Sequence, residues 1–391
     1  MEIFNSPKLN RLFDFVPQAG DNVNWRALEE SEFGLFLEQM TKIPQEYDYH
    51  QEGDVCTHTK MVVEALVSFD EFKLSSNKDK LILFLAGILH DIGKIRRTRV
   101  EDGRMISPGH ALKGAIMARG FLWKVVGLSG NLEEREIREA VCFLIRYHSY
   151  PPFAVKSHKR RLFEILSNSR LATEFDARKL YLLEKADVLG RISIDGDEYL
   201  EKVELFKLLA EENGCFEKPY VFSDDYTERQ YYLGKTEWEN DQLFDDTWGE
   251  VVLLSGLPGT GKDTFTLENH GHLPMVSLDN IRKRLGVLPT DPQGMVINVA
   301  QEEAKEYLRK KQPFVWNATN ITSQIRQKQI SLFERYNAKV KTIFLETEWQ
   351  EGLRRNGERS DSVPIAEIEK MLSKLEIPER YECEKVEWTI V

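Results

Sequence analysis

The sequence contains no apolar run long enough to cross a membrane. Its apolar stretches fall short of the roughly 20 residues that span a bilayer. The N-terminal stretch MEIFNSPKLNRLFDF has no continuous apolar segment of the kind that marks a secretory signal. Together these absences predict a cytoplasmic protein with no membrane partner.

The sequence contains few cysteines, and its basic residues are fewer than its acidic residues. The four cysteines are scattered and form no CxxC pair, so neither a disulfide framework nor a paired-thiolate metal site is expected. The formal net charge of −11 argues against a protein that coats nucleic acid nonspecifically. It leaves room for a nucleic-acid enzyme with local basic clusters, although each cluster alone is most simply a solvated face. The clusters are Arg96, Arg97 and Arg99; Lys156, Lys159, Arg160 and Arg161; and Arg282, Lys283 and Arg284.

The chain divides into two halves with different hydrophobic periods, and its 391 residues suit about two domains. Between about 32 and 209, apolar residues recur at helical spacing in one stretch after another. Examples are WRALEESEFGLFLEQM, which begins slightly earlier, DKLILFLAGILHDIGK and LEEREIREAVCFLIRYH. No stretch there alternates convincingly as a strand does, and that half is predicted to be all-α.

The second half has the pattern of an α/β domain. The short β-rich runs VVLLSG, PMVSLD, PFVWNATN, VKTIFLE and VEWTIV are separated by helical patterns, which predicts a parallel sheet with right-handed crossovers. Between the halves lies an acidic, aromatic and aperiodic stretch. The predicted organisation is an N-terminal extension over 1–30, an all-α domain over 31–215, a connecting segment over 216–249 and an α/β domain over 250–391.

The segment VVLLSGLPGTGKDTF joins a strand, a glycine-rich turn and a helix start. Its core, Gly256-x-x-x-x-Gly261-Lys262, is the pattern of a phosphate-binding loop. The glycines let backbone N–H groups wrap phosphate oxygens, and the helix N-terminus adds partial positive charge. A mere glycine-rich turn is the alternative, but the strand before it and the strand–helix alternation after it favour a loop in which Lys262 reaches the β- and γ-phosphates.

One position departs from that pattern. The residue after the lysine is normally Ser or Thr, whose hydroxyl ligates Mg²⁺, and here it is Asp263. Thr264 cannot replace it, because one step along a helix turns the side chain by roughly 100°. The third strand ends in Asn317, where many such proteins carry an acid. We hypothesise that Asp263, a good Mg²⁺ ligand, supplies the missing carboxylate.

Two further segments suit an acceptor site. In SLDNIRKRLG, Asp279 suits a general base and Arg282 suits a clamp on a neighbouring anion. In GLRRNGERSDSVP, Arg355 and Arg359 stand at i, i+4, which predicts one helical face of a lid over the transferring phosphoryl group. A plain surface arginine is the alternative for Arg359. The expected nucleotide-binding residues are Gly256, Gly259, Gly261, Lys262, Asp263, Thr264, Arg355 and Arg359.

Taken in order, GLPGTGKDT, SLDNIRKRLG, NATN and RRNGER resemble the bacteriophage-type polynucleotide 5′-kinase family, over about 251–391. The resemblance implies phosphorylation of 5′-hydroxyl ends from ATP, GTP or another nucleoside triphosphate with Mg²⁺. It implies Lys262 as the phosphate lysine, Asp279 as the base, Arg282 as the clamp on the acceptor's 3′-side phosphate and Arg355 and Arg359 as lid arginines, with Asn320 and Arg326 as weaker matches. Asp263 and Ala318 depart from the family's pattern.

The first half carries ionisable residues at helix ends or inside apolar helices, where an unpaired charge is costly. They are His58, His90, Asp91, His110, His148 and Asp187. Four of the chain's eight histidines fall in this set, whereas most isolated core histidines are only hydrogen-bonded. Metal ligation would satisfy all six at once.

The order His, His-Asp, His, His, Asp over about 45–210 resembles the HD phosphohydrolase superfamily. The resemblance implies one metal ion on His58, His90, Asp91 and Asp187, with Asp91 bridging to a second ion on His110 and His148. Mixed ligation of this kind suits Mn²⁺ or another divalent transition metal. Lys94, one helical turn after His90 if the helix continues, is expected to contact the substrate phosphate.

The order of the two halves resembles the bacterial HD–polynucleotide kinase fusions (HD-Pnk), which heal RNA ends. That resemblance implies removal of 2′,3′-cyclic phosphate and 3′-phosphate ends, phosphorylation of 5′-hydroxyl ends and sealing by a separate RNA ligase. One alternative is a nucleotide phosphohydrolase fused to a small-metabolite kinase, and another is a nucleotide-sensing regulatory module on a kinase. The sequence leaves open whether DNA also serves and which oligomer forms.

Overall fold

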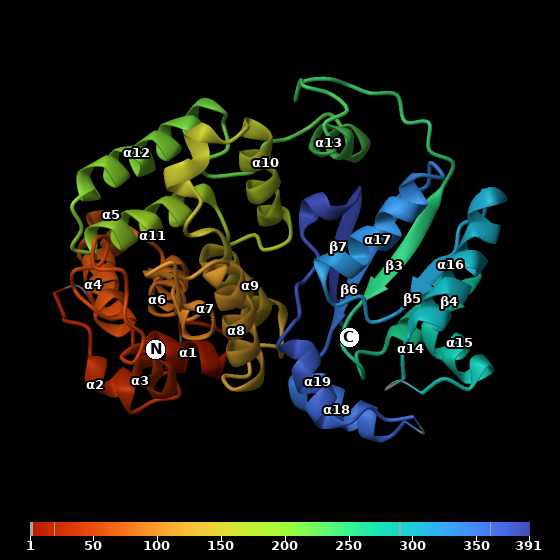
Figure 1. The fold of residues 1–391 in the computed structure, drawn as a ribbon, viewed down its shortest axis with the longest axis horizontal. Helices are drawn as coiled ribbons and strands as arrows, with labels where there is room; N and C mark the ends of the chain where they lie inside the picture. The colour runs from red at the N-terminus through yellow and green to blue at the C-terminus, as the bar shows by residue number, and fades with distance from the viewer. Residues whose placement is uncertain (1–2, 19, 289–290, 360) are drawn as a thin grey trace. The chain divides into compact units, whose positions relative to one another are not determined.

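The computed structural model describes residues 3–18, 20–288, 291–359 and 361–391. The chain forms two compact units, Met1–Tyr220 and Val221–Val391 (Figure 1). No helix within these described ranges is long and apolar enough to cross a membrane.

The first unit is helical, as predicted. Its central helix is α6, in which Leu81–Leu89 are all buried, so the helix is apolar on every side and is packed by α4, α9 and α11. The elements of this unit are α1 (Pro7–Phe13), α2 (Trp25–Glu29), α3 (Gly34–Met40), α4 (Val55–Ser68), α5 (Asp70–Leu74), α6 (Asn77–Leu89), α7 (Lys94–Arg97), β1 (Arg99–Glu101), β2 (Arg104–Ile106), α8 (His110–Lys124), α9 (Leu132–Tyr147), η1 (Pro151–Lys156), α10 (Lys159–Ser167), η2 (Asn168–Arg170), α11 (Ala177–Leu189) and α12 (Gly196–Glu212).

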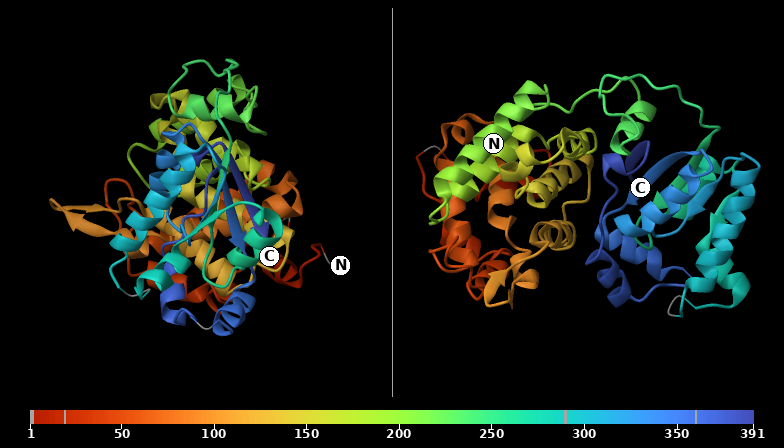
Figure 2. Two further views of the ribbon diagram at one scale, coloured as in Figure 1. Left: turned by 90° about the vertical axis from the view of Figure 1, so that its right-hand side faces the viewer. Right: turned by 45° about the horizontal axis from the view of Figure 1, so that its top comes forward.

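Two local expectations for this unit are wrong. Strands β1 and β2 pair as a small antiparallel hairpin that projects from the helices (Figure 2, left). All three residues of β1 are exposed, so the hairpin leaves no alternating apolar signal in the sequence. The stretch WRALEESEFGLFLEQM forms two helices, α2 and α3, because the chain turns between them so tightly that a Cβ on Gly34 would lie 2.0 Å from the Glu29 carbonyl oxygen.

The second unit is a parallel sheet covered by helices, also as predicted. Its elements are α13 (Asp225–Tyr232), β3 (Glu250–Ser255), α14 (Lys262–His270), β4 (Met275–Ser277), α15 (Leu278–Leu285), α16 (Gly294–Arg309), β5 (Val315–Asn317), α17 (Ser323–Glu334), β6 (Lys339–Glu346), α18 (Trp349–Gly357), α19 (Ile365–Leu372), η3 (Arg380–Glu382) and β7 (Lys385–Ile390). The five strands lie in the order β4-β5-β3-β6-β7, and each corresponds to one of the predicted β-rich runs.

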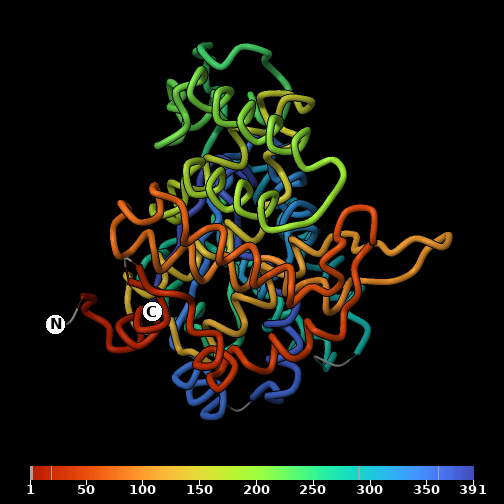
Figure 3. Tube along the Cα trace, turned by 90° about the vertical axis from the view of Figure 1, so that its left-hand side faces the viewer, coloured from red at the N-terminus to blue at the C-terminus, as the bar shows by residue number. Residues whose placement is uncertain are grey.

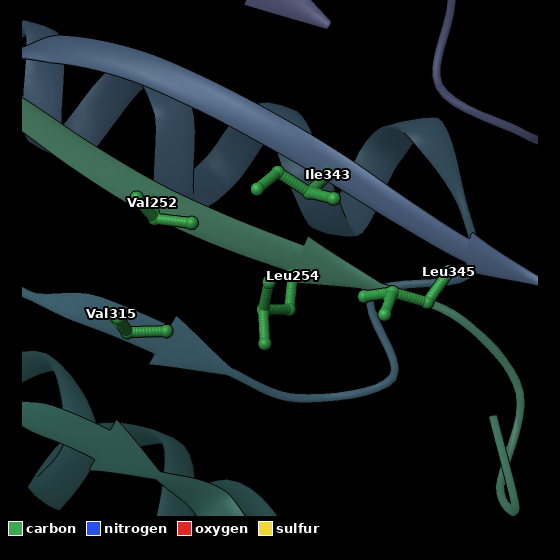
Figure 4. Close-up of a cluster of buried hydrophobic side chains, with 5 residues drawn as sticks. All are labelled: Val252, Leu254, Val315, Ile343 and Leu345. Carbon is green, nitrogen blue, oxygen red and sulfur yellow. The ribbon is translucent and has the colours of Figure 1, made fainter. Parts of the chain in front are cut away.

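Burial of the strands explains why the β-rich runs could be recognised in the sequence. Val252 and Leu254 of β3 pack with Val315 of β5 and with Ile343 and Leu345 of β6 (Figure 4). Parallel strands covered on both faces are apolar nearly throughout, which sets them apart from the helices between them. The central strand β3 lies between β5 and β6, neither adjacent to it in sequence, and a ligand site is expected at the carboxyl end of such a strand.

The acidic stretch before β3 is not aperiodic throughout, because it contains α13. Arg229 of this helix donates to Glu334 of α17 over 2.8 Å. Arg380 donates to Asp225 and Glu228 over 2.6 and 2.7 Å. These contacts hold α13 on the second unit. The helix was missed because its sequence, DYTERQYY, is short and mostly polar.

Candidate metal centre and phosphate-binding site

The six metal-ligand candidates of the first unit lie together where helices end or begin. His90 caps the C-terminus of α6, His148 caps that of α9 and His110 begins α8. Their Nδ1 atoms donate to the carbonyl oxygens of residues 87, 145 and 107 over 2.8, 2.8 and 2.9 Å. These bonds fix the tautomer and leave each Nε2 directed at the cluster. His58 of α4 and Asp187 of α11 complete the set.

The candidates form two groups that share Asp91. In the first group, His58 Nε2 lies 2.9 Å from Asp187 Oδ1 and 3.7 Å from Asp91 Oδ2, and His90 Nε2 lies 3.4 Å from Asp91 Oδ2. In the second, Asp91 Oδ1 lies 3.4 Å from His110 Nε2 and 4.0 Å from His148 Nε2. Each oxygen of Asp91 therefore faces a different group.

Buried polar atoms at the centre test whether a metal fits. His90 Nε2 and Asp91 Oδ1 are both buried and have no hydrogen-bond partner among the described residues. Leaving such atoms unpaired is costly, and a cation ligated by both groups would satisfy them. Imidazole nitrogens combined with carboxylate oxygens suit divalent transition metals. The residues present therefore fit a metal centre.

The protonation states of His148, His110 and Asp91 agree with metal ligation. Burial lowers the pKa of His148 to about 3, helped by repulsion from His110 and His90. Burial also lowers the pKa of His110, so both rings are neutral, as metal ligation requires. Burial opposes the ionisation of Asp91, but the charges of Lys94 and His90 hold its pKa well below its usual value. His58 differs: although burial disfavours its charge, nearby Asp187 and Glu52 raise its pKa to about 9.

Lys94 reaches the centre by a different route from the one expected. Helix α6 ends at Leu89 and α7 begins only at Lys94, so the condition that one helix continues from His90 to Lys94 is not met. The side chain nevertheless approaches Asp91, with Nζ 2.7 Å from Oδ2, and it donates to Gln45 Oε1 over 2.7 Å.

Sequence reasoning missed a supporting layer of residues around the ligands, which comes from the loop between α3 and α4. Glu52 Oε1 lies 3.0 Å from His58 Nδ1, and His50 Nδ1 donates to it over 2.8 Å. The Glu52 carboxylate also accepts from the Ile192 amide over 3.0 Å. His50, Glu52 and Gln45 lie in a polar stretch typical of a loop, and only their contacts with His58 and Lys94 relate them to the centre.

In the second unit, the glycine-rich loop follows β3 as expected. Gly259 and Gly261 have positive φ angles of 84° and 73°, and a Cβ on Gly259 would lie 2.2 Å from the Gly352 carbonyl oxygen. Lys262 Nζ donates to the Gly256 and Leu257 carbonyl oxygens over 3.0 and 2.8 Å. Burial lowers the Lys262 pKa to about 8, against the attraction of Asp279 and Asp263. Thr264 is exposed on α14.

The acceptor residues lie around Asp279, the second residue of α15. Arg282 Nη2 donates to Asp279 Oδ1 over 2.5 Å, and Arg359 Nη2 donates to Oδ2 over 3.4 Å. Because α18 ends at Gly357, Arg359 lies beyond it, and the expected single helical face is wrong. Arg355, still within α18, places Nη1 3.6 Å from where a Gly261 Cβ would be.

The two weaker matches have structural contacts instead. Arg326 is fully buried and donates to both carboxylate oxygens of Glu382 over 2.7 and 2.6 Å. Asn320 donates to the Leu254 carbonyl oxygen over 2.7 Å and so supports β3 where it leads into the loop.

Comparison with known proteins finds one family match within each of the two units. Residues 55–177 match the HD domain family, and residues 251–378 match an AAA domain family. The HD match includes the candidate ligands from His58 to His148 and ends before Asp187. The chain is thus an HD phosphohydrolase domain fused to a P-loop kinase-like domain.

Individual relatives are distant. The Multifunctional CCA protein of Ralstonia nicotianae is 23% identical over 212 residues, covering 51% of this chain and 44% of that protein. This chain therefore spans less than half the length of that relative. A solved structure from Chloroflexus aurantiacus, of a protein proposed to be a kinase, is 16% identical with a TM-score of 0.32, covering 37% of this chain and 86% of that one.

Proposed function

We propose that the protein heals broken RNA ends. The first unit would remove 2′,3′-cyclic phosphate and 3′-phosphate groups, and the second would phosphorylate 5′-hydroxyl ends. The observation that carries the proposal is that one chain combines two metal-ligand groups sharing Asp91 with a glycine-rich loop and a carboxylate, Asp279, that Arg282 and Arg359 contact. Breaks that carry both kinds of blocked end need both reactions before a separate RNA ligase can seal them.

The residues of the first unit suit hydrolysis of a phosphate ester. Two divalent ions, Mn²⁺ or another transition metal, would supply an activated water and a clamp for the phosphoryl group when bound to these ligands. His58, His90, Asp91 and Asp187 would hold one ion, and Asp91, His110 and His148 the other. Lys94, already at the edge of the cluster, would neutralise the phosphate of the ester.

The residues of the second unit suit phosphoryl transfer. The glycine-rich loop and Lys262 would hold the triphosphate of ATP, GTP or another donor, with Mg²⁺ ligated by Asp263. Asp279 would take the proton of the 5′-hydroxyl, and Arg282 would hold the adjacent phosphate. Arg355 and Arg359 would balance the charge on the transferring group. None of these residues reads a base, so binding through the backbone and acceptance of many sequences are expected.

One oligonucleotide tests both halves. An RNA with a 5′-hydroxyl and a 2′,3′-cyclic phosphate is incubated with ATP, Mg²⁺ and Mn²⁺, and both ends are resolved by mass spectrometry. Wild type should change both ends, Asp91→Ala only the 5′ end and Lys262→Ala only the 3′ end. If neither end changes while free mononucleotides are turned over, the RNA-repair proposal is wrong and a metabolite enzyme is the better description.

A further inference from the structure

We infer that the loop between α3 and α4 binds the unpaired bases of the RNA next to the end being hydrolysed, by stacking on Tyr47 and Tyr49. We call residues 44–54 the tyrosine loop. The inference deepens the proposed function and rests on it, because it assigns the substrate's bases a place beside the metal centre of the first unit.

The tyrosine loop is closed at its base. Pro44 and Asp54 form an isolated antiparallel bridge, and Gln45 N donates to the Gly53 carbonyl oxygen over 2.9 Å. Gly53 has a φ angle of 102°, a conformation that L side chains rarely adopt. The segment therefore has a defined conformation and presents its central residues together.

Both limbs of the tyrosine loop are attached to the metal centre. On one side, Gln45 accepts from Lys94, which contacts Asp91. On the other, Glu52 lies 3.0 Å from His58 Nδ1. Tyr47 and Tyr49 stand two and three residues from these anchors, so their backbones lie within about 7 and 11 Å of them. The rings are thus close enough to meet nucleotides adjoining an ester bound at the centre.

The side chains of Tyr47 and Tyr49 are both exposed to solvent. Tyr47 is 69% exposed and Tyr49 is 48% exposed. A single exposed apolar residue is ordinary. Two aromatic residues separated by one position, on a loop anchored at one end to Lys94 and at the other to His58, form a surface suited to stacking.

Arginines without an ion-pair partner among the described residues lie on the segments next to this surface. Glu46 of the loop accepts from the Met105 amide over 2.7 Å, so the hairpin of β1 and β2 lies beside the tyrosine loop (Figure 3). Arg96, Arg97 and Arg104 are exposed and make no ion pair within the part of the chain that the structure describes. In a chain of net charge −11, three unpaired arginines in one neighbourhood indicate an anionic partner.

Nearby carboxylates equal these arginines in number but are not paired with them in the part of the chain that the structure describes. Glu101 is already paired with Arg99 over 2.7 Å, and Glu46 is engaged by a backbone amide. Asp48 and Asp102 are the exposed acids left on the loop and the hairpin. Because Glu46 keeps its charge, three arginines face three acids here, but no acid is paired with Arg96, Arg97 or Arg104 within the described residues, so these guanidinium groups can contact phosphate.

Aromatic rings beside unpaired cations are the means by which proteins bind single-stranded nucleic acid. The rings stack on any base, and the cations follow the phosphate backbone without reading sequence. A duplex would hide its bases from the rings. The geometry therefore favours a single-stranded 3′ end, held by the one or two nucleotides before the terminal phosphate.

The test uses the full chain with Mn²⁺ and two readouts. One is the KM for hydrolysis of a single-stranded RNA 3′-phosphate, compared with an abasic oligomer that has the same phosphate end. The other is the Kd, by fluorescence anisotropy, of a 3′-hydroxyl RNA whose 5′ end is blocked by the fluorophore. The variants are Tyr47→Ala/Tyr49→Ala and, to keep the rings, Tyr47→Phe/Tyr49→Phe.

A matched control is available in the same unit. Leu74 is 87% exposed and precedes the N-terminus of α6, whereas His90 caps the far end of that 13-residue helix, roughly 20 Å away. Leu74→Ser therefore removes an exposed apolar side chain far from the metal centre.

The alanine double variant should raise the RNA KM and Kd by about tenfold or more, as expected for the loss of two stacked bases. Its KM for the abasic oligomer should be unchanged, and the phenylalanine variant and Leu74→Ser should match wild type. The inference is overturned if the alanine variant has the KM and Kd of wild type for RNA. It is also overturned if KM rises equally for RNA and the abasic oligomer, or if Leu74→Ser raises KM and Kd as much as the alanine variant does. If wild type binds RNA through the rings but cleaves no RNA end, the proposed function fails and the binding surface remains.

Discussion

Asn317 donates a hydrogen bond from Nδ2 to Oδ1 of Asp263 over 2.6 Å, joining the end of β5 to the first turn of α14. In the usual phosphate loop the α14 position carries a hydroxyl, and many such proteins carry an acid at the end of the β5 strand. Here the acid stands on the helix and the amide on the strand. A carboxylate is therefore still present at this place, but it comes from the other element.

Exchanging the two residues tests this relationship. Asp263→Ser should reduce kinase activity by about 100-fold or more at limiting Mg²⁺, because it removes the only carboxylate of the pair. Asp263→Ser combined with Asn317→Asp should recover much of that loss, because a hydroxyl and a strand-end acid are again present. The measurement is 5′ phosphorylation as a function of Mg²⁺ concentration. A single variant with undiminished rate and metal dependence would refute a role for Asp263 in holding Mg²⁺.

Lys262 predicts a pH dependence of nucleotide binding. Its pKa is lowered to about 8 by burial, and bound phosphates would raise it. Below pH 8 the lysine is charged before binding, so affinity is constant. Above pH 8 binding must take up a proton, and Kd for ATP should weaken by up to about tenfold per pH unit. Lys262→Met should bind weakly at every pH and lose this dependence. An equally steep profile in that variant would assign the titration to another group.

Glu52 predicts a dependence of metal affinity on the tyrosine loop. Its carboxylate lies beside His58 Nδ1, where it would orient the ring so that Nε2 can ligate a metal ion. Glu52→Ala should weaken binding of Mn²⁺ by about 10- to 100-fold while the helical fold is kept. Calorimetry of metal binding measures the change directly, and circular dichroism checks the fold. Thr41→Ala, a change at an exposed residue at the end of α3, is the control. Unchanged Mn²⁺ affinity in Glu52→Ala would leave Glu52 with no role in positioning His58.

Burial decided which helices and strands could be predicted from the sequence. The strands of the second unit and the long helices of the first bury continuous apolar surface, so the spacing of their apolar residues could be recognised in the sequence. The hairpin of β1 and β2 and helix α13 are exposed or polar and left no such signal. The break between α2 and α3 depends on a close approach at Gly34 that only the folded chain reveals.

The same distinction applies to the candidate site. His58, His90 and His148 stood out because a histidine within or at the end of an apolar helix is unusual. Gln45 and Glu52 did not, because a polar residue in a loop is ordinary until its partner is known. Distant pairs such as Asp263 with Asn317 could be suspected from their positions in the motif, but their contact depends on the register of β5.

Asp279 predicts a separation of the two activities. Asp279→Asn keeps the size of the side chain but removes the base, and 5′ phosphorylation should fall by about 100- to 10,000-fold. The Kd for ATP should change little, because the lysine and the glycine-rich loop remain. Hydrolysis of the 3′ phosphate should equal that of wild type, since the residues of the first unit are untouched. A comparable loss of both activities would contradict independent sites.

The buried pair of Arg326 and Glu382 predicts a loss of stability rather than of chemistry. The guanidinium makes two hydrogen bonds to the carboxylate and others to the carbonyl oxygens of Asn320 and Glu376, all inside the second unit. Glu382→Ala leaves a buried charge without its partner and should lower the free energy of unfolding of that unit by about 3–5 kcal/mol. Replacing both residues by apolar ones of similar size, as in Arg326→Met with Glu382→Leu, should recover part of the loss. Denaturant unfolding measures the difference, and 5′ phosphorylation by the folded fraction should remain close to wild type. If the double variant is folded but its kcat falls by about 100-fold or more, Arg326 contributes to phosphoryl transfer after all, and the buried contacts are not its whole role.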